Sequence, residues 1–170
     1  GVRLLEKGAA ADLASEDPDR AANKLAAKAH GLLLLKRSEA AAAAADQALT
    51  HSQSVKIRFL AARVFVETGR TAQVRTLSDG LASELQPEPR AYASIIDGLG
   101  HMKQGDMRQA IEAFTAANGL LDTWIGHFDL GRAYLAAGAF PQADSELERC
   151  IKRRGEALAT GNLGSAAESL

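Results

Sequence analysis

The stretch "DLGRAYLAAGAFPQADSELERC", residues Asp129 to Cys150, decides the fold because its glycines and apolar residues recur earlier in the chain. Gly131 and Gly138 follow Gly98 and Gly105 at the same spacing of 33 residues. Three further pairs share that spacing: Ala110 with Ala143, Phe114 with Leu147, and Ala117 with Cys150. Five matched positions at one offset indicate a structural repeat, which must be recognised before single residues are interpreted.

Two earlier copies are more divergent. In "AARVFVETGRTAQV" Gly69 stands 36 residues before Gly105, and the three extra residues fall at "LQPEPR", where Pro87 and Pro89 interrupt a helix. In "AHGLLLLKRSEAAAAAADQAL" we expect a turn near Lys36 to Ser38. The chain therefore contains about four copies of one unit.

Each copy predicts a helix, a short turn and a second helix. The turn glycines Gly69, Gly105 and Gly138 follow apolar runs and tolerate the positive φ that ends many helices. The second helices are predicted to start near Ser38, Asp106 and Pro141, and apolar residues then recur at helical spacing. Alternating β-type runs are scarce, so we predict an all-α protein.

The order of small, bulky and glycine positions in "LGRAYLAAGAFPQADSELERC" resembles the tetratricopeptide repeat, or TPR. The resemblance implies a right-handed superhelical solenoid and places repeats at about 22–54, 55–90, 91–123 and 124–157, after a partial or capping helix over 1–21. The sequence departs from the family at repeat position 4, where tryptophan is usual, and at position 32, where proline is usual. The C-terminal residues 158–170 are predicted to form a flexible tail.

Composition narrows the class of function. The formal charge is -1, so no overall basic surface predicts nucleic-acid binding. Apolar runs such as Leu32 to Leu35 are too short to cross a membrane. The single cysteine excludes an internal disulfide. We expect a cytoplasmic location, and the start at Gly1 rather than methionine suggests a fragment of a longer protein.

The histidines, the cysteine and the tryptophan could in principle bind a metal or react, but their positions predict a structural role. His30, His51, His101 and His127 are far apart and form no paired metal-ligand motif. Cys150 occupies a position where helices touch, and Trp124 is expected to fill a junction between helices. No phosphate loop or nucleophile elbow is present. We expect no catalytic residue, no cofactor and no metal, and therefore no enzyme.

The resemblance implies that the first helix of each repeat lines a concave groove. Its side chains would combine apolar anchors with a few cations, which suits a bound peptide or helix. The predicted groove residues are Lys56, Phe59, Arg63, Tyr92, Ile95, Met102, Phe128, Arg132 and Leu135.

The predicted function is a non-enzymatic protein-interaction scaffold for a protein or peptide partner, with no nucleic acid and no membrane involved. Exposed solenoid ends would also allow a homodimer. The last repeat resembles repeat regions of large bacterial signalling proteins, some of them kinase-linked. The alternative is therefore a regulatory or sensor module of such a protein.

Overall fold

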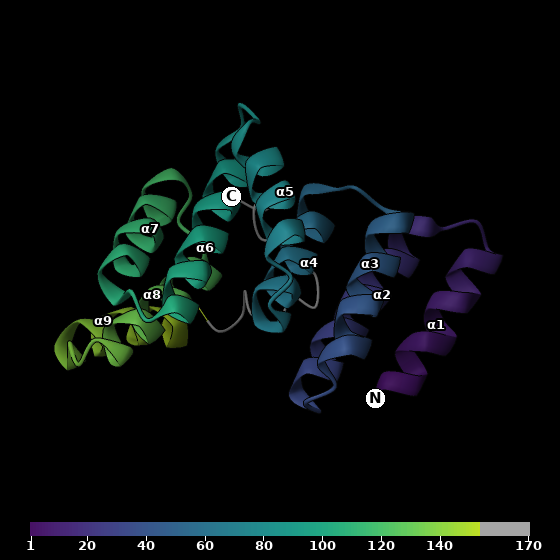
Figure 1. Ribbon diagram of the computed structural model, residues 1–170, viewed down its shortest axis with the longest axis horizontal. Coiled ribbons are helices and arrows are strands. Elements are labelled where there is room, and N and C mark those ends of the chain that lie inside the picture. Colours follow the sequence, from purple (N-terminus) through teal and green to yellow (C-terminus); the bar gives the residue numbers. More distant parts are fainter. Residues whose placement is uncertain (154–170) are drawn as a thin grey trace. The chain divides into compact units, whose positions relative to one another are not determined.

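The computed structural model describes residues 1–153, and these residues form nine α-helices joined by short turns (Figure 1). The helices are α1 (Val2–Ala14), α2 (Pro18–Leu34), α3 (Ser38–His51), α4 (Val55–Thr68), α5 (Thr71–Ala82), α6 (Pro87–Gln104), α7 (Met107–Leu120), α8 (Trp124–Ala136) and α9 (Phe140–Lys152). The all-α prediction is confirmed for this part of the chain. The predicted tail, 158–170, lies outside the described residues.

The helices divide between two compact units, residues 1–77 and 78–170, and the division falls inside α5. In the first unit α2 packs against α1, α3 and α4. In the second unit α6 packs against α7, and α8 packs against α7 and α9. Figure 1 shows the members of each antiparallel pair, such as α6 with α7, side by side.

The turns inside the helix pairs carry the left-handed backbone that the glycines predict. Gly69, Gly105 and Gly138 have φ of 74°, 82° and 75°. In the first, alanine-rich pair the same role falls to Lys36, with φ 59°. Positive φ is uncommon for residues other than glycine. The predicted turns are confirmed, and the first of them along the chain, at Lys36, is built without a glycine.

The starts of α2, α7 and α8 carry a short polar side chain that caps the helix. The carboxylate of Asp106 accepts from the backbone N–H of Gln109, and Asp17 does the same for Arg20 at the start of α2. Such caps satisfy backbone donors that the first helical turn leaves unpaired. The helix starts at Ser38, Met107 and Phe140 agree with the sequence, while α2 begins at Pro18, a few residues before the repeat start predicted at about 22.

The core of the first unit is built around the alanines of α3. Leu32, Val64 and Phe65 from the neighbouring helices pack against this helix. The buried alanines of α3 are Ala41, Ala42, Ala44, Ala45 and Ala48. Because alanine is small and favours helices, α2 and α4 approach α3 closely without loss of helix stability.

The second unit pairs a glycine with a large side chain. A Cβ built on Gly98 of α6 would lie 2.6 Å from Cε1 of Phe114 on α7, and one built on Gly131 of α8 would lie 3.0 Å from Cδ2 of Leu147 on α9. Phe114 is fully buried. The glycine and the bulky residue of the repeat pattern therefore touch within each helix pair of this unit.

Candidate binding surface

The predicted groove residues lie on the first helices of three pairs. They come from α4 (Lys56, Phe59, Arg63), α6 (Tyr92, Ile95, Met102) and α8 (Phe128, Arg132, Leu135). The exposed fractions of these residues differ. Phe59 and Ile95 are 0% exposed and Tyr92 is 4% exposed, whereas Leu135 is 52% exposed. The other five are partly exposed. Since a partner reaches only exposed atoms, the three buried residues can act only as support for their neighbours.

Two of these helices carry the same phenylalanine and arginine pair. The guanidinium carbon of Arg63 lies 5.5 Å from the ring centroid of Phe59, and that of Arg132 lies 5.8 Å from the ring centroid of Phe128. Both pairs are four residues apart, so they share one helical face. At these distances the aromatic face attracts the cation and holds it in place.

On α8 the pair extends into a longer stripe. The ring of Trp124 stacks on Phe128 with centroids 5.2 Å apart and planes 7° apart. Arg132 also donates to Asp129 over 3.0 Å, and Asp129 is fully buried. Trp124, Phe128 and Arg132 thus form a fixed row of planar groups, with the exposed Leu135 beyond them. Fixed side chains lose little conformational entropy when a partner binds.

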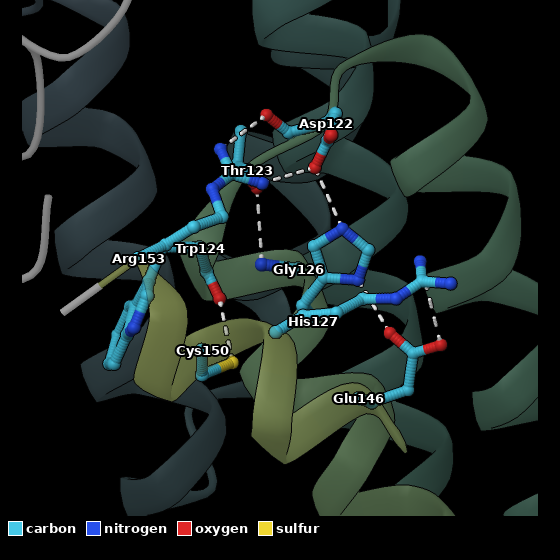
Figure 2. Close-up of polar contacts among 9 residues, drawn as sticks. Asp122, Thr123, Trp124, Gly126, His127, Glu146, Cys150 and Arg153 are labelled. Atoms are coloured by element: carbon cyan, nitrogen blue, oxygen red, sulfur yellow. Dashed lines mark hydrogen bonds and ion pairs between the residues drawn. The ribbon is translucent and has the colours of Figure 1, made fainter. Parts of the chain in front are cut away.

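A second cluster lies around His127, on α8 (Figure 2). Its Nε2 is 2.7 Å from Oδ1 of Asp122, and its Nδ1 is 2.5 Å from Oε2 of Glu146 on α9. His127 is 6% exposed. A neutral imidazole donates one hydrogen bond and an imidazolium donates two. The doubly protonated ring is therefore the form that donates to both carboxylates.

Arginine side chains surround the same carboxylates. Arg153 donates to both the side chain and the backbone carbonyl of Asp122, and Arg149 lies 3.9 Å from Glu146. Burial alone would raise the pKa of Asp122, but hydrogen bonds from Arg153 and His127 outweigh it, so the pKa of Asp122 is lowered. The cluster ties the loop before α8 to α9.

The polar atoms of this cluster are engaged in contacts with one another. Both ring nitrogens of His127 already face carboxylates, and within residues 1–153 no group of three or more histidine, cysteine, aspartate or glutamate side chains is arranged to hold a metal ion. The thiol of Cys150 donates to the carbonyl oxygen of Trp124 over 3.7 Å, and burial raises its pKa. A raised pKa keeps cysteine in its unreactive thiol form.

Sequence reasoning identified His127 as a packing residue, which its burial confirms, but it missed the two carboxylates. Asp122 and His127 are the residues at which the last repeats depart from the TPR pattern, at positions 32 and 4. Those two departures are the signal that could have found the cluster. Trp124 packs along α8 against Phe128, four residues further along the same helix.

The other predicted structural residues are also placed. Cys150 is 6% exposed, as its packing position predicts. His30, His51 and His101 are each partly exposed and lie on different helices. Within residues 1–153, no helix combines the length and the apolar character needed to cross a bilayer.

Comparison with known proteins identifies a fold. No protein-family model matches the chain, and no curated protein matches it. Among solved structures the chain is similar to MamA, residues 41 to the end, from Desulfovibrio magneticus RS-1, with a TM-score of 0.50. The identity is 16%, and the match covers 91% of this chain and 96% of that one. The chain therefore has an all-α, TPR-like helical-repeat fold.

Proposed function

We propose that the chain is a non-enzymatic protein-interaction scaffold whose first helices bind a peptide or a helix of another protein. The observation that carries the proposal is the row of Trp124, Phe128 and Arg132 on α8, held by stacking and by the buried Asp129. Aromatic residues and arginine dominate the energetics of protein interfaces, most of all where they are ordered before binding.

The apolar character of α8 supports the same proposal. A helix that is apolar around its whole circumference is typically covered on every side. α8 packs against α6, α7 and α9, yet Trp124, Ile125 and Phe128 remain partly exposed and Leu135 is 52% exposed. A partner segment that contacts Leu135 would remove this apolar surface from water, at about 25 cal/mol per Å² buried.

The experiment is selection of binding peptides from a random library displayed on phage, with the purified chain immobilised. Selected peptides are then titrated against Leu135→Asp and Arg132→Gln. Glutamine keeps a hydrogen-bond donor for Asp129, so the fold should survive. We expect each substitution to weaken binding at least about tenfold, because both alter the exposed edge of the row.

The matched controls are Thr115→Asp and Arg108→Gln, which make the same kinds of change at exposed positions of α7, the second helix of its pair. Their affinities should stay within about twofold of the parent chain. Equal loss in both sets, or no loss in the α8 variants, would remove α8 from the binding surface. Circular dichroism of every variant separates a lost contact from a lost fold.

A further inference from the structure

The turn between α2 and α3 carries two exposed leucines. Leu34 is 84% exposed and Leu35 is 59% exposed. Single apolar side chains are common on protein surfaces, whereas neighbouring ones form a patch that would be more stable out of water.

The fold does not require leucine at these two places. Lys36 is the residue of positive φ in this turn, where the later pairs have glycine. The other three turns close with polar residues or alanine, so the leucines are particular to the first pair. The two residues before the turn glycine in those pairs are Glu67 and Thr68, Lys103 and Gln104, and Ala136 and Ala137.

Backbone hydrogen bonds hold the turn in one conformation. The N–H of Lys36 donates to the carbonyl oxygen of Leu33 over 2.9 Å. The N–H of Arg37 donates to the carbonyl oxygen of Leu32, also over 2.9 Å. This pair of bonds closes a helix on a residue in left-handed backbone. Because the turn is already ordered, the two exposed leucines lose little backbone entropy when they enter an apolar phase.

Cations adjoin the leucines. Lys36 and Arg37 follow them directly in the sequence, and both are exposed. Arg70, from the turn between α4 and α5, lies 2.5 Å from Glu39 near the start of α3. The neighbouring turn therefore brings its own cation to this end of the unit, where it is paired with Glu39.

The start of α1 lies at the same end of the unit (Figure 1). A Cβ built on Gly31, near the end of α2, would lie 3.4 Å from Cγ2 of Val2. Leu4, one turn into α1, is 75% exposed, and the neighbouring Arg3 is exposed as well. We call this end of the unit the basic end, and it comprises Arg3, Leu4, Leu34, Leu35, Lys36 and Arg37.

The opposite end of the unit, where α1 gives way to α2, carries the other sign. It holds three acids, Glu16, Asp17 and Asp19, and one cation, Arg20, which pairs with Asp17. The 17 residues of α2 separate the two ends by about 25 Å, several times the screening length of about 8 Å at physiological salt. An anionic surface would therefore attract one end and repel the other.

We propose that the basic end docks on an anionic lipid surface, with the turn leucines among the acyl chains and Lys36 and Arg37 at the level of the lipid phosphates. Apolar side chains flanked by cations occupy this boundary, where the long cationic side chains keep their charges in water. Each cation near an anionic bilayer strengthens binding by about fivefold. A bilayer offers both an apolar phase and a layer of negative charge, which are the two things that this end matches.

Other occupants match the basic end less well. A nucleic acid would contact the cations but leave the leucines in water. A second copy docked through the same end would bring like charges together. The expectation that no membrane is involved rests on the length of the apolar runs, and length decides only whether a helix can span a bilayer.

The test is co-sedimentation of the whole chain with lipid vesicles. Vesicles of phosphatidylcholine alone are compared with vesicles in which about a third of the lipid is phosphatidylglycerol. We expect binding to the anionic vesicles to be at least about tenfold stronger. Most of that difference should disappear in about 1 M salt, where the screening length falls to about 3 Å.

Two double variants separate the apolar and the charged parts of the patch. Leu34→Ser with Leu35→Ser should weaken binding to the anionic vesicles at least about tenfold. Lys36→Gly with Arg37→Gln should weaken it by about tenfold or more. Glycine adopts the positive φ of position 36 without strain, so the turn should be retained.

Matched controls make the same kinds of change at exposed positions of the second unit. They are Leu85→Ser with Ile151→Ser, and Arg108→Gln with Lys152→Gln. Each should change binding by less than about twofold. Circular dichroism of every variant identifies a lost fold.

A fluorescent label tests the orientation and keeps the proposal decidable if a double variant fails to fold. In a Cys150→Ala background, Leu35→Cys or Asp19→Cys supplies a single thiol at the basic or the acidic end. Each is labelled with nitrobenzoxadiazole, whose emission shifts to the blue in an apolar environment. Anionic vesicles should shift the emission of the label at position 35 and leave that at position 19 unchanged.

Equal binding to the two kinds of vesicle, no binding to either, equal losses in variants and controls, or a blue shift confined to position 19 would overturn the inference. A dimer that forms without lipid and depends on the turn leucines would replace it with self-association. An oligonucleotide that binds whether or not these leucines are present would replace it with nucleic-acid binding. The scaffold proposal is judged separately, by the sensitivity of library-selected peptides to Leu135→Asp.

Discussion

Replacing Gly98 with alanine tests the glycine and phenylalanine contact that joins α6 to α7. The added Cβ would lie 2.6 Å from Cε1 of Phe114 and 2.8 Å from two further ring atoms. Phe114 is fully buried, so its ring has no free space into which to move. Alanine in place of glycine gains about 0.5–1 kcal/mol in a helix, whereas overpacking a core costs about 1–3 kcal/mol. We expect a net destabilisation of about 1–2 kcal/mol.

Gly100→Ala is the matched control, because Gly100 lies on the same helix and nothing is within 4 Å of a Cβ built there. This substitution should stabilise the chain by about 0.5–1 kcal/mol. Urea unfolding followed by circular dichroism compares the two variants. The fluorescence of Trp124, the single tryptophan, reports on the second unit. On heating, each kcal/mol should move the Tm by about 2–4 °C.

A double variant separates the ring contact from other effects of the substitution. Phe114→Leu removes the ring atoms that an alanine at position 98 would meet, so Gly98→Ala should cost less in that background than in the parent chain. The two changes should couple by about 1 kcal/mol. If Gly98→Ala were as stable as Gly100→Ala, the close contact would be wrong and the small residue would serve another purpose.

The remaining predictions concern polar groups in the interior. Glu146→Gln, which removes the charge facing Nδ1 of His127, should destabilise the second unit by about 1–3 kcal/mol in urea unfolding near neutral pH. Because the pKa of His30 is lowered in the folded state, the unfolded chain binds more protons between that pKa and about 6.5, so stability falls as the pH drops through this window. His30→Asn should flatten that dependence, and unfolding at pH 7 and pH 5 checks it. Both amide atoms of Asn118 are buried without a hydrogen-bond partner among the described residues, so Asn118→Ala should cost less than about 1 kcal/mol.

The helical architecture could be predicted from the sequence because most turns are marked by a particular residue at the turn itself. Gly69, Gly105 and Gly138 each end a helix in left-handed backbone, and glycine is the residue that adopts it without strain. Lys36 and Glu16 adopt positive φ without that signal. Their turns could be placed only through the neighbouring apolar periodicity, which accounts for the weaker definition of the first repeat.

The binding face was harder to predict. The helical period of a sequence indicates the direction in which a side chain points, but it does not indicate how deeply that side chain is buried. Phe59 and Phe128 occupy equivalent places and each supports an arginine, yet Phe59 is fully buried and Phe128 is partly exposed. The cluster at His127 was hidden for another reason. Glu146 lies nineteen residues away on the next helix, and only the packing of α8 on α9 brings the two together.

The two units use different residues where paired helices touch. Where the second unit fits a glycine of one helix against a large side chain of the next, Gly98 with Phe114, the first unit uses alanine at both equivalent places, Ala29 and Ala45. Both solutions bring helices close, but only the first leaves a contrast of small and large residues in the sequence. A repeat search depends on that contrast, so it finds the second unit readily and the first with difficulty. The degenerate sequence of the first repeat therefore reflects a different interface within the same fold.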